Sequence, residues 1–394
     1  MMSQTEISLA KRRLLIHDSL AFLALILITG ALFLVTLFLF RSFTSHRTEL
    51  AVRWSDRGKT ALHAGKPDQA IIALRTALSY APGARPYELL LAQALANAGR
   101  TEEASNYFMS LWGTQPGDGF INLELARLAA KKNDPQAAIR YYRASIYGTW
   151  EGDGVVRRRD VRLELARYLM DQHDMNAARI ELLIAAGNSP SDPGLNKTLA
   201  GLLVQAGDLV DGLSYYQKAL QSNSKDPAAL EGAGRTAYRL GDFAVAHSLL
   251  ERALEAKASP REKEEQNLSG GLAEMLERSK RLLQLRPSGK LRPQERIARI
   301  LTDRAIAEKR FEGCVTQLAA AVALPPQMQQ LKLRWTSDEA TDGRAALSRS
   351  LAKQDAAVQL IYDTELQTSQ FCGAPIGDDA LLLLLAKSPE ATGR

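Results

Sequence analysis

The chain of 394 residues is 46% hydrophobic, 24% charged and 6% aromatic. This composition supplies ample apolar side chains for a core and excludes disorder throughout. Its 50 Lys and Arg against 44 Asp and Glu give a net charge of +6, which is too small and too evenly spread to indicate a nucleic-acid-binding protein. Helix-forming residues, above all Ala, Leu, Arg, Glu and Gln, dominate over β-branched ones, so we expect an all-α fold with very little strand.

The strongest local signal lies near the N-terminus, where the run LAFLALILITGALFLVTLFLF at residues 20–40 contains no charge. As a helix rising about 1.5 Å per residue, it matches the roughly 30 Å hydrocarbon core of a bilayer. The run ends at Arg41, without the small-x-small site of a cleaved signal peptide. We therefore expect a single-pass transmembrane helix, an uncleaved signal anchor, between a basic tail at residues 1–19 and a juxtamembrane linker at residues 41–50.

Basic residues flank this run on both sides, so the positive-inside rule does not fix its orientation. Lys11, Arg12 and Arg13 precede it, and further Arg and Lys residues follow it from Arg41 onwards. A short basic tail before a first span resembles a signal anchor whose N-terminus is inside. This orientation would place residues 41–394 on the extracytoplasmic side of the membrane.

From Ala51 onwards the sequence repeats with a period of 34 residues. With Ala51 as position 1, Gly58, Gly65, Ala70 and Ala77 fall at positions 8, 15, 20 and 27, and small or turn-forming residues recur at these positions. Six repeats follow from this register: 51–84, 85–118, 119–152, 159–192, 193–226 and 227–260.

The pattern over residues 51–260 resembles that of the tetratricopeptide repeat (TPR) family. The resemblance implies an α-solenoid of antiparallel helix pairs, the TPR superhelix. Small residues at positions 8 and 20 would allow the two helices of a repeat to approach closely, and position 27 would do the same against the next repeat. Gly or Asn at position 15 is expected to end the first helix in a left-handed conformation.

Beyond Pro260 the pattern loosens, and residues 261–394 predict degenerate TPR-like and capping helices. We expect RPSGKLRP, at residues 286–293, to be a linker and a seventh helix pair to begin at Glu295, with Cys314 as a small buried thiol at position 20. Cys314 and Cys372 are too few and too far apart to predict a disulfide framework or a Cys-x-x-Cys metal site. The sequence leaves their oxidation state open.

Motifs for catalysis were not found. The sequence contains no phosphate-binding loop, Gly-x-Ser-x-Gly elbow, His-Glu-x-x-His helix or dinucleotide fingerprint, and its five histidines are dispersed. We therefore expect no catalytic residues, no metal site, no cofactor and no enzymatic activity.

The TPR resemblance implies that the first helices of the repeats line a concave groove, with positions 2, 5, 9, 12 and 13 facing inwards. Positions 5 and 9 combine leucines with basic residues, which predicts a groove for an extended segment or helix carrying acidic groups, since Arg pairs bidentately with carboxylates. The alternative is an ordinary solvated face. The family's carboxylate clamp, with Asn at position 9 of its first repeat, is not reproduced here. The predicted groove residues are Lys59, Leu89, Leu123, Arg127, Leu163, Arg167 and Arg235.

These observations favour a membrane-anchored scaffold or adaptor that binds other proteins, in the assembly of an envelope or membrane complex. The alternative is a regulatory or substrate-binding subunit of a separately encoded enzyme, such as a glycosyltransferase or protease. A third alternative is homo-oligomerisation through the repeats. The sequence does not identify the client protein, because the identity of a groove lies in scattered surface side chains.

Overall fold

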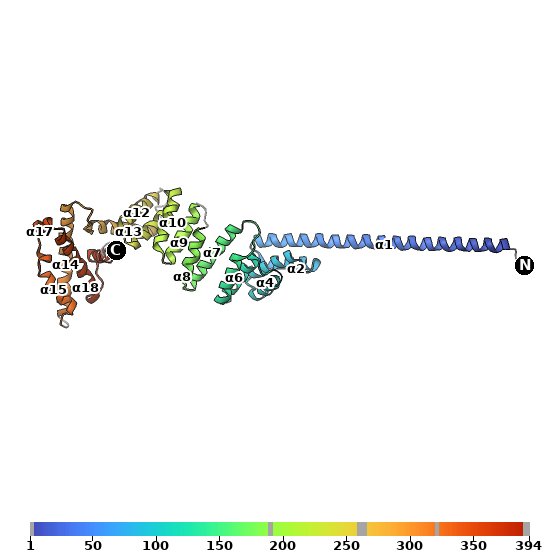
Figure 1. The fold of residues 1–394 in the computed structure, drawn as a ribbon, viewed down its shortest axis with the longest axis horizontal. Coiled ribbons are helices and arrows are strands. Elements are labelled where there is room, and N and C mark those ends of the chain that lie inside the picture. The colour runs from blue at the N-terminus through green and yellow to red at the C-terminus, as the bar shows by residue number, and fades with distance from the viewer. Residues whose placement is uncertain (1–3, 188–191, 258–265, 320–322, 389–394) are drawn as a thin grey trace. The chain divides into compact units, whose positions relative to one another are not determined.

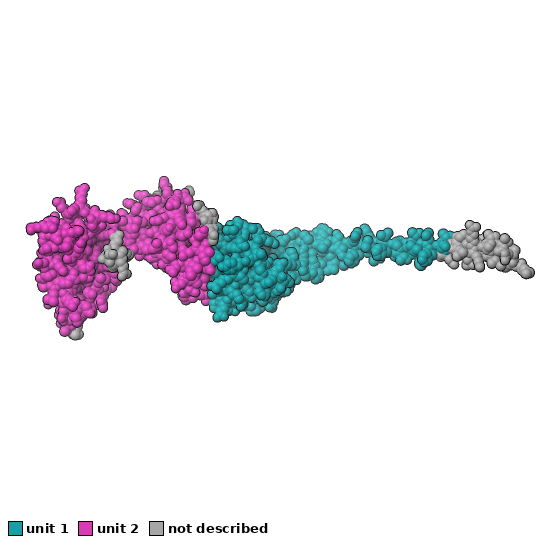
Figure 2. Space-filling model, viewed as in Figure 1, with its two compact units in different colours: residues 1–165 teal, residues 166–394 magenta. Residues whose placement is uncertain are grey.

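The computed structural model describes residues 4–187, 192–257, 266–319 and 323–388. Within these ranges the chain forms helices and one isolated bridge between Asp118 and Thr149, without a strand. The expected all-α fold is confirmed. The chain divides into two compact units, residues 1–165 and residues 166–394 (Figure 2).

Helices follow one another along the whole described chain (Figure 1). The first unit contains α1 (Gln4–His63), α2 (Pro67–Tyr80), α3 (Arg85–Asn97), α4 (Thr101–Thr114), α5 (Gly119–Lys131), α6 (Pro135–Tyr147) and most of α7 (Gly154–Asp171). The second contains the end of α7 and α8 (Met175–Gly187), α9 (Pro193–Gln205), α10 (Leu209–Ser222), α11 (Pro227–Leu240), α12 (Phe243–Lys257), α13 (Gln266–Leu285), α14 (Pro293–Ala319), α15 (Pro326–Trp335), α16 (Asp338–Thr341), α17 (Arg344–Arg349), α18 (Leu351–Phe371) and α19 (Gly377–Ala386). The end of α1 packs against α2, α3 against α4, α5 against α6, α9 against α10 and α11 against α12.

Small residues allow the helices of a pair to approach closely, as the repeat pattern predicts. A Cβ atom on Gly58 would lie 2.6 Å from Cγ of Leu74, and one on Gly234 would lie 2.7 Å from Cδ2 of Leu250. Each contact joins position 8 of a first helix to position 24 of the second. The residues at positions 8, 20 and 27 are buried throughout the six repeats: Gly58, Ala92, Ala126, Ala166, Ala200 and Gly234; Ala70, Ala104, Ala138, Ala178, Gly212 and Ala246; Ala77, Leu111, Ser145, Ala185, Ala219 and Ala253.

Position 15 adopts a left-handed backbone conformation in every repeat. The six residues are Gly65, Gly99, Asn133, His173, Gly207 and Gly241, with φ between 55° and 86°. Asn133 is of a residue type that adopts this conformation readily, whereas at His173 the Cβ atom disfavours it by roughly 1–2 kcal/mol. The packing of both neighbouring helices therefore imposes the turn even where the local residue does not favour it.

The N-terminal helix α1 runs without interruption through residues 20–40 and into the first repeat. It is the one helix among the described residues that is long and apolar enough to cross a membrane, by length and composition. Its large apolar side chains are uncovered by protein; Phe22, Phe33 and Phe38 are 65%, 66% and 71% exposed. Residues 41–50, which we expected to form a linker, are helical.

The last helices depart from the expected seventh repeat. The residues from Glu295 onwards form part of one helix of 27 residues, α14, instead of a helix pair. The prediction of a seventh pair is wrong because position 15 is Lys309, and the three residues on either side of it (IAEKRFE, residues 306–312) include no Gly, Asn or Pro to end the helix there.

Cys314 in α14 and Cys372 after α18 form a disulfide, with their Cα atoms 5.6 Å apart. Cys314 is therefore not the free buried thiol that its repeat position suggests. The bond joins residues separated by 58 positions, which in a chain-entropy estimate stabilises the folded state by about 4 kcal/mol.

Two carboxyl groups are deeply buried among the described residues of this region. Asp303 of α14 is 1% exposed and Glu365 of α18 is fully buried. Burial raises the pKa of Asp303 to about 8, against the partial opposition of nearby Arg299. Burial and the neighbouring carboxyl group of Asp379 raise the pKa of Glu365 to about 8, against the partial opposition of Arg310. Both groups are therefore largely protonated in the folded chain at neutral pH.

The raised pKa values predict that the second unit becomes less stable as the pH rises from about 4 to about 8. Between about pH 4 and pH 8 the folded chain retains protons on Asp303 and Glu365 that the unfolded chain has lost, so the free energy of unfolding falls as pH rises through this window. Asp303→Asn combined with Glu365→Gln should flatten this slope and raise the Tm at pH 8.5 by about 5 °C. The measurement is thermal unfolding of the full chain in detergent from pH 5 to pH 9.

The control for this prediction is Glu277→Gln, which alters an exposed carboxylate of α13. It should leave the pH slope unchanged. A slope that is the same in the double variant and in the parent chain would contradict the prediction.

Candidate functional site

A hollow of about 270 Å³ lies in the first unit between the first helices of three successive repeats. The end of α1, α3 and α5 form its walls. Its lining residues are Lys59, Leu62, His63, Leu90, Gln93, Asn97 and Glu124. They occupy positions 6, 9, 12 and 13 of their repeats, because one face of each first helix recurs at this spacing. We call this hollow the groove.

The lining of the groove combines uncharged amides with apolar and charged side chains. The side-chain amides of Gln93 and Asn97 each combine donors with an acceptor, and neither has a protein partner among the described residues. Leu62 and Leu90 supply apolar surface beside them. Lys59 is exposed, and its ammonium lies 3.6 Å from Asp56, an exposed pair that contributes little stability.

Glu124, which lines the groove on the α5 side, belongs to a network of charges. The guanidinium of Arg127 donates to Glu164 at 2.8 and 2.7 Å through Nε and Nη2, and to Glu124 at 2.7 Å through Nη1. Tyr142 donates its hydroxyl to Glu164 at 2.9 Å. Burial raises the pKa of Glu124 in spite of Arg127, while the hydrogen bond to Glu164 raises the pKa of Arg127. The network fixes α5 against α7 within the first unit.

The structure places the predicted groove residues of the first unit in different roles. Lys59 lines the groove. Leu123 and Leu163, at 8% and 6% exposure, contribute to the core, and Leu89 is half-buried beside the apolar cluster of the first repeats. Arg127 forms ion pairs through its guanidinium with Glu124 and Glu164. The apolar surface of the groove therefore comes from positions 12 and 6 and not from the leucines at position 5.

The two predicted residues of the second unit also differ from each other. Arg235 pairs with Glu231 at 2.8 Å, and Glu231 accepts a second ion pair from Lys257. Arg167 is exposed and has no ion pair in the described part of the chain. The basic row that the sequence suggests is thus partly neutralised within the protein.

Sequence reasoning missed the groove residues Leu62, His63, Leu90, Asn97 and Glu124. Leu62, His63 and Asn97 lie at positions 12 and 13, which were expected to face inwards, whereas Leu90 and Glu124 lie at position 6, which was not. The prediction of an acidic ligand depended on the basic residues at position 9. The glutamates at position 6 of two successive repeats, Glu124 and Glu164, indicate that this charge is internally paired.

Because Arg127 and Arg167 occupy equivalent repeat positions but unequal surroundings, their substitutions should differ. Arg127→Met leaves two partly buried carboxylates without a counter-charge and should destabilise the chain by about 1–2 kcal/mol. Arg167→Met, on an exposed side chain, should change stability by less than about 0.5 kcal/mol. Thermal unfolding of both variants in detergent measures the difference.

Adding Glu124→Gln to Arg127→Met should recover part of the loss, because it removes one of the two unpaired charges. Equal effects of Arg127→Met and Arg167→Met would show that the network contributes no stability.

Comparisons with known proteins bear on the family. One model of the tetratricopeptide repeat matches residues 61–119 and 203–262, and a second model of the same repeat matches residues 163–227. No curated protein sequence matches the chain. Similar solved structures include a MamA protein (18% identity, TM-score 0.36, covering 45% of this chain and 93% of that one). They also include Pseudomonas aeruginosa pilF (17%, TM-score 0.41, 57% and 99%) and PilW, described as a type IV pilus biogenesis factor (19%, TM-score 0.40, 57% and 97%). The helix pairs, the left-handed turns and the matched residues together show that the chain contains tetratricopeptide repeats.

Proposed function

We propose that this protein is a membrane-anchored adaptor that holds an extended segment of a partner protein in the groove of its first unit. The observation that carries the proposal is the groove itself, where the amides of Gln93 and Asn97 stand without protein partners beside Leu62 and Leu90. Such amides can pair with the main chain of an extended peptide, and the leucines can cover alternate side chains. Helical repeat arrays commonly present binding surfaces of this kind.

Charge at the groove favours a segment with an acidic group near its beginning. Lys59 and His63 stand at the α1 side, whereas Glu124 stands at the α5 side. An acidic side chain or carboxylate would pair with Lys59, and a main-chain N–H would donate to Glu124. Arg127, with its guanidinium already bound by two carboxylates, would support the wall instead of contacting the ligand.

We further propose that residues 20–40 anchor the chain in the membrane and that the repeats lie on the extracytoplasmic side. The exposed apolar side chains of α1 support the anchor, because only a lipid environment would cover them. The disulfide between Cys314 and Cys372 supports the orientation, because disulfides persist in oxidising compartments and are rare in the cytosol. An adaptor in this position would serve the assembly of an envelope or membrane complex.

The groove is tested by site-specific photo-crosslinking in cells, with p-benzoyl-phenylalanine in place of Gln93. We expect discrete cross-linked partner proteins whose yield falls about threefold when Lys59→Glu is added, since an exposed pair is worth up to about 1 kcal/mol. The control places the same probe at Gln69, an exposed position of α2. Identical products from both positions, or none from Gln93, would refute binding in the groove.

The identity of the cross-linked proteins separates the two function classes. Several structural membrane or envelope proteins favour the adaptor. One enzyme recovered in equal amount with the chain favours the alternative, a regulatory or substrate-binding subunit of that enzyme.

The orientation is tested by thiol alkylation in acid-quenched cells. If the repeats are extracytoplasmic, a maleimide-polyethylene glycol reagent should modify neither cysteine until a reductant is added, after which it should modify both. Cys314→Ser supplies the control, because it leaves Cys372 as a free thiol that should react without reduction. Modification of both cysteines in the parent chain without reductant would place the repeats in the cytoplasm.

A further inference from the structure

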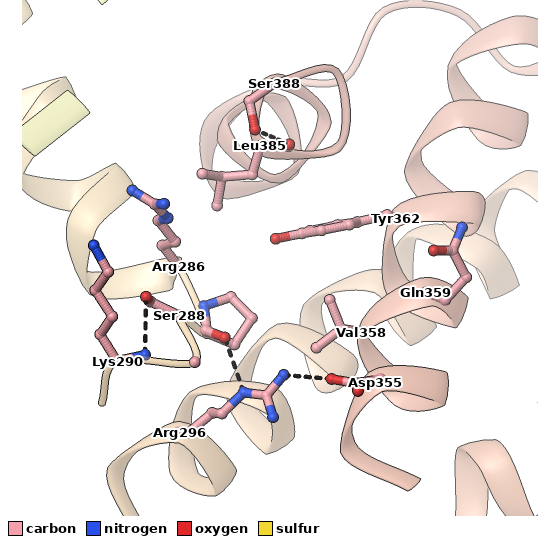
Figure 3. A pocket seen from close by; sticks show the side chains of 12 residues that line it. Arg286, Ser288, Lys290, Arg296, Asp355, Val358, Gln359, Tyr362, Leu385 and Ser388 are labelled. Carbon is pink, nitrogen blue, oxygen red and sulfur yellow. Dashed lines mark hydrogen bonds and ion pairs between the residues drawn. The ribbon is translucent and has the colours of Figure 1, made fainter. Parts of the chain in front are cut away.

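The second unit contains a cavity of about 500 Å³ among its last helices (Figure 3). Its walls come from α18, the end of α19, the start of α14 and the loop between α13 and α14. This size is typical of pockets for small molecules. None of its lining residues belongs to the six repeats.

A buried tyrosine without a partner points into this cavity. Tyr362 of α18 is 9% exposed, and its hydroxyl extends into the space between Leu385 and the loop that carries Arg286 and Ser288 (Figure 3). Among the described residues, the hydroxyl has no hydrogen-bond partner. Burial raises the pKa of Tyr362 to about 12, so the group remains a neutral donor at physiological pH. The hydroxyl is open to the cavity, where it can donate to an acceptor on a bound molecule.

The charges around the cavity favour an anion as that acceptor. Arg286, Lys290 and Arg296 line it, against a single acidic residue, Asp355. Asp355 is already held by Arg296 at 2.7 Å. The positive charges of Arg286 and Lys290 lie on the side of the cavity that Tyr362 faces (Figure 3).

The loop that carries these cations is fixed by hydrogen bonds from the next helix. Arg296 donates through Nε to the carbonyl oxygen of Pro287 at 3.1 Å and through Nη1 to Gln354 at 2.8 Å. Arg299 donates to the carbonyl oxygen of Arg286 at 3.0 Å. Residues 286–293, which we expected to be only a linker, are therefore held in place as one wall of the cavity. A preorganised wall lowers the entropic cost of binding.

Apolar side chains complete the cavity. Val358 and Leu385 line it, and the ring of Tyr362 stands between them (Figure 3). We propose that this cavity binds a small organic oxyanion, a carboxylate or phosphate. Its oxygens accept from the Tyr362 hydroxyl and pair with Lys290, and its short apolar body packs against Val358 and Leu385.

The test is isothermal titration of the full chain in detergent with three probes: phenyl phosphate, benzoate and inorganic phosphate. Phenyl phosphate and benzoate share the apolar ring and differ in the oxyanion, whereas inorganic phosphate lacks the ring. We expect saturable binding of phenyl phosphate or benzoate with a Kd of about 0.1 mM. Inorganic phosphate should bind at least about tenfold more weakly, because it leaves the apolar wall uncovered.

Two substitutions assign the binding to this cavity. Tyr362→Phe removes only the hydroxyl and should raise the Kd five- to tenfold, and Lys290→Gln, on an exposed side chain, should raise it about threefold and reduce its dependence on salt. The matched controls are Tyr216→Phe, which packs in the apolar cluster of α10 to α13 instead of the one that contains Tyr362, and Lys332→Gln on α15. Neither control should change the Kd.

Absence of saturable binding of all three probes up to about 10 mM, or equal Kd values in the two variants and the two controls, would overturn the proposal. If Tyr362→Phe lowers the Tm of the ligand-free chain, the Kd of the Lys290→Gln variant alone tests the proposal. The Lys290 side chain is exposed and makes no contact in the core, so its substitution should not affect folding.

Discussion

The close approach of the two helices in each repeat is the constraint on which the rest of the array depends. Where Gly58 faces Leu74 and Gly234 faces Leu250, even one additional methyl group would overlap the partner side chain. The buried alanines at the equivalent positions serve the same purpose. This contact sets the distance and angle within a pair. It thereby also sets which face of each first helix remains uncovered, and in the first unit that face is the wall of the groove.

The repeat fold could be predicted from the sequence because its determinants are local and recur. Small residues at fixed spacing and a turn residue at position 15 each have a direct structural reason, and the register survived even where His173 replaces glycine. The seventh repeat shows the limit of this reasoning. From Glu295 several positions match the pattern, yet Lys309 stands where the turn is needed, and α14 continues through it. Small residues permit a helix pair, but without a turn they also suit a single long helix.

The groove was predictable in position but not in chemistry. Repeat phase indicates which side chains face inwards, and Lys59 and Gln93 are found there. Whether an inward cation is available depends on its neighbours in the next repeat. Glu164 binds Arg127 across a separation of 37 residues, and Glu231 binds Arg235 within one helix turn. A prediction that considers each basic residue without its neighbours therefore overestimates the positive charge of the surface. The amides and apolar side chains between the paired charges determine what can bind.

The cavity and the disulfide of the last helices could not be predicted from the sequence, because both depend on contacts between residues that are distant along the chain. The loop at residues 286–293 is ordered by guanidinium groups of α14 that reach its carbonyl oxygens, and no local pattern encodes such contacts. Cys314 and Cys372 meet because α14 and α18 pack together, although 58 positions separate them in the chain. These helices do not need a small residue at every fixed position, and they retain buried carboxyl groups, Asp303 and Glu365, whose burial is costly. The disulfide and the apolar cluster around Ile300 and Ile361 offset that cost. The repeats are thus constrained by packing, whereas the end of the chain has room for chemistry that depends on charge.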